Sequence, residues 1–139
     1  MSFVNSMNIS SSGLNVERAR MDLISQNIAN ANTTRTEDGG PYKRQSLLIR
    51  EGKGSFQNVL NDKLSGVEIE KVTEDNSDFK RVFKPNHPDA DDDGYVLMPN
   101  VDVVTEMVNM ISASRGYEAN ITAFNASKNM ALKALSIGR

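Results

Sequence analysis

Apolar side chains recur at helical spacing near the start of the chain, over residues 14–31, and they fall on one narrow face. They include Leu14, Met21, Ile24 and Ile28. This pattern predicts an amphipathic helix, which Phe3, Val4 and Met7 extend backwards. Residues 10–13 read SSSG and favour a helix poorly, so we expect a kink or fraying there.

A second apolar pattern, with alternating steps of four and three, runs through the last third of the chain. Its positions are 103, 107, 110, 114, 117, 121, 124, 128, 131 and 135, and eight of these ten are apolar. The pattern predicts a coiled-coil seam on one long helix from about 101 to 137, capped by Asn100 or Asp102. At 1.5 Å per residue this helix is roughly 55 Å long. A compact globule of this chain length is only about 35–40 Å across, so the helix must overhang it.

Between these two patterns the period changes to that of strands. Four short segments, punctuated by glycines and prolines, are predicted as strands: 42–50, 67–72, 79–84 and 95–98. We expect an α+β fold with long N- and C-terminal helices packed as a coiled-coil-like pair and a small, mostly antiparallel β region inserted between them. The expected division is an N-terminal helical assembly segment at 1–36, a β region at 37–99 with a mobile loop at 52–66, and a C-terminal long helix at 100–139.

Composition changes this picture in one respect. Only 6% of the residues are aromatic and there is no Trp, so the core must be thin. Two helices cannot enclose both apolar seams, and the β region is too small to cover the rest. The remaining apolar surface therefore indicates contacts with other chains.

Charge and apolar runs argue against several classes of partner. The net charge of −2, with both signs interleaved, gives no reason to expect nucleic acid or an anionic membrane. No run approaches the roughly 18 apolar residues of a membrane span, so membrane insertion is not expected. The first residues lack a basic start, an apolar run and a cleavage site, so a cleaved signal peptide is not expected.

Three asparagines close the first predicted helix. Asn27 and Asn30 are three residues apart and share a face, where a seam asparagine fixes register by requiring a matching hydrogen bond. The alternative is that the asparagines only fray the helix end and that Asn32 is its C-cap. The pattern alone leaves both interpretations open.

The segment 89–100, DADDDGYVLMPN, resembles the start of a calcium-binding EF-hand loop. Asp89, Asp91, Asp93 and Gly94 match that pattern, but its twelfth position is Asn100 instead of Glu. Prolines at 85 and 88 leave no entering helix. The segment is either a solvated acidic turn or the calcium turn of a soluble helical adaptor, which is our alternative hypothesis for function. His87 has no second histidine or cysteine with which to form a metal site, and no positioned partner for catalysis, so we expect it to be a turn residue and expect no metal there.

Three segments of the chain resemble a known family. They are SQNIANANTT, GGPYKRQ and HPDADDDGYVLMPNVDVVTEMVNMISASRGYEANITAFNASKNMALKAL. They are similar to the bacterial flagellar basal-body rod proteins, and the central and C-terminal stretch is most similar to their proximal-rod member. The resemblance implies a structural subunit with no catalytic site, so we expect no catalytic residues, no cofactor and no enzyme. It also implies that the terminal helices are largely unfolded in the monomer. The subunit would polymerise through these helices into the drive shaft that transmits motor torque across the periplasm.

The resemblance also implies partners and a route. The partners are copies of the chain itself, other rod proteins (the FlgB, FlgF and FlgG types) and the flagellar export apparatus. The chain would leave the cytoplasm without signal-peptide cleavage and reside in the basal body.

The seam and the family match together predict the assembly contacts. They are Leu14, Met21, Ile24, Asn27, Ile28, Asn30, Asn32, Val103, Met107, Met110, Ser114, Arg115, Tyr117, Ile121, Phe124 and Leu135. Glu106 and Asn120 also occupy positions that match the family. Gly116 departs from the Ala or Ser that the family more often has there, and we expect a softer helix at that position.

Overall fold

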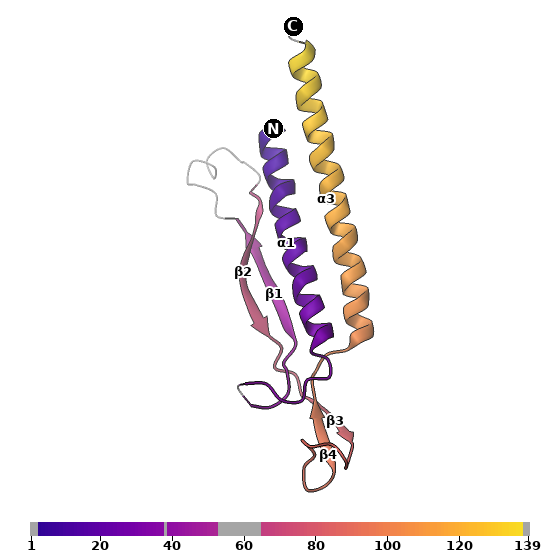
Figure 1. Cartoon of the computed structure of the whole chain (residues 1–139). Helices are drawn as coiled ribbons and strands as arrows, with labels where there is room; N and C mark the ends of the chain where they lie inside the picture. The colour runs from indigo at the N-terminus through magenta and orange to yellow at the C-terminus, as the bar shows by residue number, and fades with distance from the viewer. Residues whose placement is uncertain (1–2, 38, 53–64, 138–139) are drawn as a thin grey trace.

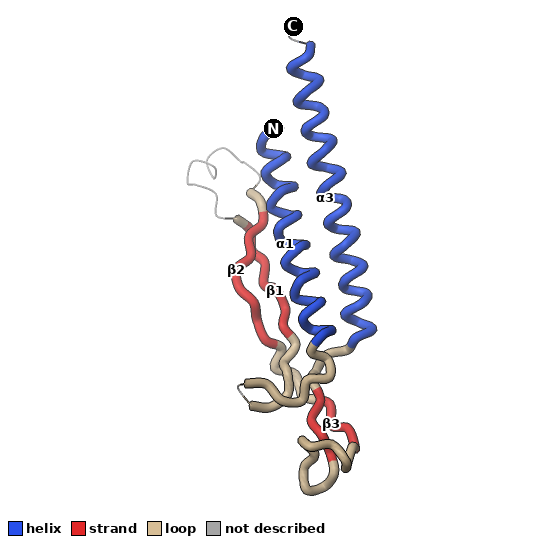
Figure 2. Tube along the Cα trace, in the orientation of Figure 1, coloured by secondary structure: helices blue, strands red, loops and turns tan. Residues whose placement is uncertain are grey.

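A computed structural model describes residues 3–37, 39–52 and 65–137 of the chain. Two helices and four strands follow one another within these ranges (Figures 1 and 2). Their bounds are α1 Phe3–Ala29, β1 Gln45–Glu51, β2 Val67–Glu74, β3 Lys80–Phe83, β4 Tyr95–Met98 and α3 Val103–Ile137. The strands pair as two separate antiparallel hairpins, β1 with β2 and β3 with β4. The expected α+β fold is confirmed, and all four predicted strands are present.

The two helices lie side by side and run in opposite directions, with the end of α1 beside the start of α3 (Figure 1). We call this shared end the joint end of the helix pair. The 35 residues of α3 rise about 52 Å, so α3 extends past the first turn of the 27-residue α1. Asp102 caps α3, because its Oδ1 accepts the N–H of Val104 at 3.0 Å.

The expected interruption of the first helix at residues 10–13 is wrong. The helix continues through Ser10, Ser12 and Gly13. Ser12 Oγ donates a hydrogen bond to the carbonyl of Ile9 at 2.7 Å, and Gly13 lies against Asn120 of α3. Tertiary packing therefore overrides the weak local preference of these residues. The mobile loop predicted at 52–66 lies almost entirely outside the described residues.

The β1–β2 hairpin is attached to α1 at two heights. Near one end, the Val67 N–H donates to Ser12 Oγ at 3.1 Å. Near the joint end, both backbone groups of Gln45 bond to the side chain of Asn27. The hairpin thus lies along α1 on the side away from α3, and one flank of α3 is left without a described neighbour (Figure 1).

The buried apolar set is small, as the composition predicts. Within the described ranges it consists of Val16, Ile24, Ala31, Val96, Val101 and Ala113. The largest fully buried side chains also include Glu106 and Asn27, which are polar. Neither described helix is both long and apolar enough to cross a membrane. Polar contacts must therefore contribute much of the specificity of this fold.

Candidate assembly site

Asn27 is 1% exposed and connects three elements at the joint end. Its Nδ2 donates to the Gln45 carbonyl at 2.8 Å and to Glu106 Oε2 at 3.1 Å. Its Oδ1 accepts the Gln45 N–H at 2.9 Å and the Tyr42 hydroxyl at 3.0 Å. All four hydrogen-bonding positions of the amide are used, so α1, β1 and α3 meet in one defined register.

Glu106, also 1% exposed, is the second centre of this cluster. Its Oε1 accepts hydrogen bonds from Arg44 Nε at 3.0 Å and from Arg44 Nη2 at 2.9 Å. Asn109 Nδ2 adds a third at 3.3 Å. A buried carboxylate requires such partners, because an uncompensated charge away from water costs several kcal/mol. We call Asn27, Tyr42, Arg44, Gln45 and Glu106 the polar cluster.

Further bonds link the polar cluster to the chain leading into α3. The Arg44 N–H donates to Asn100 Oδ1 at 2.8 Å, and Asn100 Nδ2 donates to the Asp75 carbonyl at 2.9 Å. Burial raises the pKa of the Tyr42 phenol above its usual value, and the nearby carboxylates of Glu106 and Glu74 raise it further. The phenol is therefore neutral at pH 7 and remains a hydrogen-bond donor to Asn27.

The middle of the helix pair contains two reciprocal contacts at glycines. A Cβ on Gly13 of α1 would lie 2.9 Å from Asn120 Oδ1 of α3. A Cβ on Gly116 of α3 would lie 3.2 Å from Glu17 Cδ of α1. On each helix the glycine lies four residues from the polar side chain. Each helix therefore has one glycine without a Cβ, which leaves a space that we call a glycine notch, and one polar side chain that fills the notch of the other helix. The expected softening at Gly116 is untested, but the contact gives this glycine a packing role.

The Glu17 carboxylate lies within this contact. Its Oε1 is 3.5 Å from Arg20 Nη1, and its Oε2 is buried without a hydrogen-bond partner among the described residues. A buried, unpaired carboxylate oxygen is costly, and the glycine notch is what allows the side chain to lie there at all.

The helix–helix interface uses only half of the predicted seam. Toward the chain interior, α3 buries Glu106, Ala113 and Ser127, with Asn120 against Gly13 completing the same heptad position. The prediction instead assigned this side of the seam to 107, 114, 121 and 128, one residue further on. For the internal pair the prediction is wrong at 107, 121 and 128, which are exposed, whereas Ser114 is half-buried. The small and polar side chains that replace them allow close helix approach and find polar partners.

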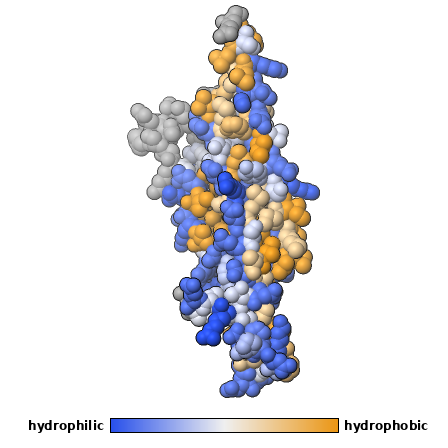
Figure 3. All heavy atoms as spheres, viewed as in Figure 1, coloured by the Kyte–Doolittle hydropathy of each residue, from blue (hydrophilic) through white to orange (hydrophobic). Residues whose placement is uncertain are grey.

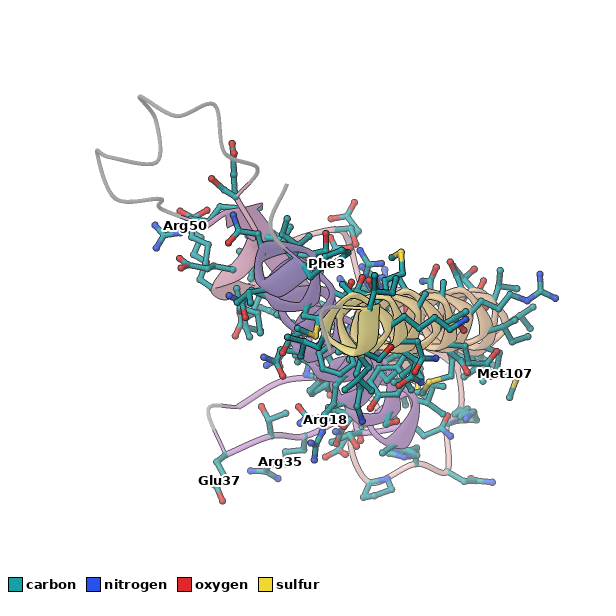
Figure 4. The ribbon with its side chains drawn as sticks, turned by 90° about the horizontal axis from the view of Figure 1, so that it is seen from above. Phe3, Arg18, Arg35, Glu37, Arg50 and Met107 are labelled. Carbon is teal, nitrogen blue, oxygen red and sulfur yellow. The ribbon has the colours of Figure 1, made fainter. Side chains whose placement is uncertain are left out.

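The predicted assembly contacts therefore fall into two groups. The first group is buried or half-buried in the chain: Leu14, Met21, Ile24, Asn27, Ile28, Asn30, Val103, Met110, Ser114, Tyr117 and Phe124. The second group is exposed: Asn32, Met107, Arg115, Ile121 and Leu135. Figure 4 shows Met107 at the edge of the molecule, directed away from α1. The structure adds three contact residues that the prediction lacks: Glu17, Tyr42 and Arg44. Tyr42 and Arg44 lie within the segment GGPYKRQ that resembles the family, and this was the sequence signal for them. Glu17 had no such signal.

The two asparagines predicted to share a role differ. Asn27 makes the cross-element bonds described above. Asn30 bonds within its own helix end, donating to the Gln26 carbonyl at 2.9 Å and accepting the Thr33 hydroxyl at 3.2 Å. Asn30 thus follows the local interpretation and Asn27 the register interpretation, although its partners lie in the same chain.

The acidic segment before β4 is a hydrogen-bonded turn. Asp91 Oδ1 accepts the Tyr95 N–H at 2.7 Å, and Asp89 Oδ2 accepts the Thr34 hydroxyl at 2.7 Å. Gly94 has a φ of 79°, which closes the turn, and His87 Nδ1 accepts the Asp89 N–H at 3.1 Å. In the described ranges no three His, Cys, Asp or Glu side chains gather in a way that could hold a metal ion.

Comparisons with known proteins agree with the family resemblance. The model of the family "Flagella basal body rod protein" matches residues 7–35, and that of "Flagellar basal body rod FlgEFG protein C-terminal" matches residues 92–137. These two ranges contain most of α1 and all of α3.

Relatives of this chain in several bacteria carry the name flagellar basal-body rod protein FlgC. The chain is 44% identical to the one from Bacillus subtilis (strain 168), with both chains covered completely. It is 45% identical to the one from Borreliella burgdorferi, over 99% of this chain and 98% of that one. It is 39% identical to the one from Salmonella typhimurium (strain LT2), again over both whole chains. The chain therefore belongs to the FlgC family of flagellar basal-body rod proteins, and it is a structural protein of the rod, not an enzyme.

Proposed function

We propose that this rod protein polymerises through its terminal helices and forms part of the proximal rod, the shaft that transmits motor torque across the periplasm. The observation that carries the proposal is the outward flank of α3. Val104, Met107, Val108 and Ile111 are each more than half exposed there. A row of large apolar side chains on one helix face marks an interaction surface.

The location of the helices supports the same proposal. The polar cluster holds α3 to α1 at the joint end, so the outward flank has a fixed orientation relative to the rest of the chain. A neighbour that packs on this flank would therefore meet a defined surface. Of the predicted contacts, we assign Met107, Arg115, Ile121 and Leu135 to neighbouring subunits. The buried and half-buried contacts support assembly by ordering the helix pair, and Asn32 is exposed in the turn after α1.

The proposed partners are copies of this chain and other rod proteins of the FlgB, FlgF and FlgG types. We further propose that the flagellar export apparatus carries the chain out of the cytoplasm without cleavage. The small buried apolar set supports this route, because a marginally stable monomer is easily unfolded for a narrow channel.

The proposal is tested in a flagellated bacterium that lacks its own copy of this rod protein. Expression of the chain should restore motility, and the uncleaved chain should copurify with isolated basal bodies, as mass spectrometry would detect. A chain with Met107→Asp and Ile111→Asp should be made but should not enter basal bodies. Normal incorporation of that variant would remove the outward flank from the assembly surface.

A second measurement tests folding on assembly. The helix content of the purified chain, from far-UV circular dichroism, should be low in dilute solution and should rise with protein concentration. A chain that is fully helical at every concentration and does not associate would contradict polymerisation through the terminal helices.

A further inference from the structure

Two apolar surfaces without a described neighbour lie at opposite ends of α3. The first is the row Val104, Met107, Val108 and Ile111, which we call the outer stripe. Their exposed fractions are 71%, 53%, 61% and 57%. The spacing of three, four and seven places them on one face, and the buried Glu106 and Ala113 lie on the opposite face, toward α1.

The second surface is the free end of α3. Gly13 lies against Asn120, and the helices are antiparallel, so Phe3 of α1 reaches only to about residue 130 of α3. The last turns of α3 extend beyond it (Figure 1). They contain the half-buried Ala131 and the exposed Leu132 and Leu135, whose exposed fractions are 55% and 73%, and the exposed Lys128 lies one turn before them. We call these four residues the tip.

Figure 3 shows both surfaces in one view, as hydrophobic side chains on the flank of α3 near the joint end and again near the C-terminus. The tip repeats the spacing of the outer stripe, because 128, 131, 132 and 135 are related as 104, 107, 108 and 111 are. Each set spans about 10 Å along its helix. The two surfaces are therefore of matching length and matching period.

We propose that the tip of one copy docks on the outer stripe of a second copy, with the two α3 helices pointing in the same direction. This proposal rests on polymerisation through the terminal helices and names the surfaces involved. Because the two surfaces differ, the contact is heterologous, and it generates an open, head-to-tail series of subunits.

Electrostatics favour this orientation. In a parallel overlap, the C-terminal end of one α3, which carries a partial negative charge, lies beside the N-terminal end of the next, which carries a partial positive charge. When residues 128–135 lie beside 104–111, the Lys128 ammonium approaches Asp102, whose carboxylate is held at the first turn of its own helix.

A stripe-to-stripe dimer is the main competing arrangement. It would be closed by two-fold symmetry, it would leave the tip uncovered and it would end growth at two copies. The two arrangements make opposite predictions for variants that alter one surface only.

The test uses sedimentation velocity of the full chain over a wide range of concentration. Val108→Asp alters the outer stripe, Leu135→Asp alters the tip, and Asn129→Asp is a control with the same added charge on an exposed polar position of α3. The wild type and the control should form species larger than dimers as concentration rises. Each of the other two variants alone should stay monomeric, with association at least tenfold weaker.

An equimolar mixture of Val108→Asp and Leu135→Asp is the decisive sample. The intact tip of the first fits the intact stripe of the second, so the mixture should form heterodimers and nothing larger. Dimers of Leu135→Asp alone would overturn the proposal in favour of stripe-to-stripe pairing. A wild type that remains monomeric throughout would overturn it as well.

Cross-linking gives a second measurement that does not depend on affinity. The chain has no cysteine, so Ile111→Cys and Leu135→Cys introduce single thiols. On oxidation, a mixture of the two should give the 111–135 heterodimer in excess over both homodimers, because a disulfide requires Cα atoms within about 7 Å. An excess of 111–111 homodimers would contradict the proposal. If the wild type enters basal bodies but the heterodimer does not form, head-to-tail docking fails and the rod function stands.

Discussion

The two ends of α3 differ in what holds them. At the joint end, Glu106 is 1% exposed and bonds to Asn27, Arg44 and Asn109, which come from α1, the chain before β1 and α3 itself. At the other end, Leu132, Leu135 and Ile137 are all more than half exposed. One helix is thus fixed by the chain's own contacts at its start and left open to neighbours at its end.

This difference shows that polar side chains make the defining contacts inside the chain, whereas many large apolar side chains stay on its surface. Inside the chain, a charged residue and an amide define the meeting of three elements. Outside, large apolar side chains remain in contact with solvent. A monomer built in this way has a small free energy of unfolding, which suits a subunit that completes its folding and packing only in an assembly.

Removing the Glu106 carboxylate should have the largest effect on the joint end. Glu106→Ala leaves the Arg44 guanidinium and the Asn27 amide without their partner, and we expect a loss of about 3 kcal/mol in the free energy of unfolding. Urea titration followed by circular dichroism, at one fixed protein concentration at which the chain is helical, measures it. The matched control is Glu118→Ala, an exposed acid of α3, which should change stability by less than about 0.5 kcal/mol. Equal effects of the two would show that both parts of α3 are held alike.

Asn27 and Asn30 give the next comparison. Asn27→Ala leaves the Gln45 N–H and carbonyl without partners, and we expect a loss of about 2 kcal/mol. Asn30→Ala removes only bonds within the helix end and should cost about 0.5 kcal/mol. Thermal unfolding of both variants checks the order. Should Asn30 prove the more costly, the register role assigned to Asn27 would be wrong.

Gly116→Ala separates helix propensity from packing. Alanine should add about 1 kcal/mol of helix stability, but its Cβ would lie 3.2 Å from Glu17 Cδ, so we expect almost no net change. In a Glu17→Ala background the contact is absent, and the full gain of about 1 kcal/mol should appear. A double-mutant cycle measures this coupling. A gain of the same size in both backgrounds would support a merely soft helix at Gly116.

The smallest effect concerns pH. The pKa of Tyr42 is raised in the folded chain above the ordinary value of 10.0, so the folded state holds this proton more tightly than the unfolded state. Its contribution to stability is therefore complete below pH 10 and is lost as pH rises through the folded pKa. Denaturation at pH 8 and above pH 10 should show this loss, and Tyr42→Phe should reduce it. An identical pH dependence in the variant would exclude Tyr42 as its source.

The helices and strands could be predicted from the sequence because their signals are local. The alternation in β2 and the long period in α3 each depend on neighbouring residues, and the structure has both elements. The side of the seam that packs inward could not be predicted in full. Met107 and Ile121 are apolar and were assigned to it, whereas Glu106 and Asn120 take those places.

The reason is that the partners of these polar residues are far away in the sequence. Glu106 is buried only because Arg44, 62 residues earlier, neutralises it. Asn120 fits only because Gly13 has no side chain. Hydrophobic periodicity carries no information about such pairs, so the polar cluster and the glycine notches required the three-dimensional structure.

The paired notches at Gly13 and Gly116 have a mechanical consequence. If α1 slid along α3 by one helical turn, Glu17 and Asn120 would each meet a residue that has a Cβ, whichever direction the slide took. The interlocked side chains therefore oppose axial shear between the two helices. A subunit with this feature would pass a twisting load to its neighbours as a stiff unit, without creep inside its own helix pair.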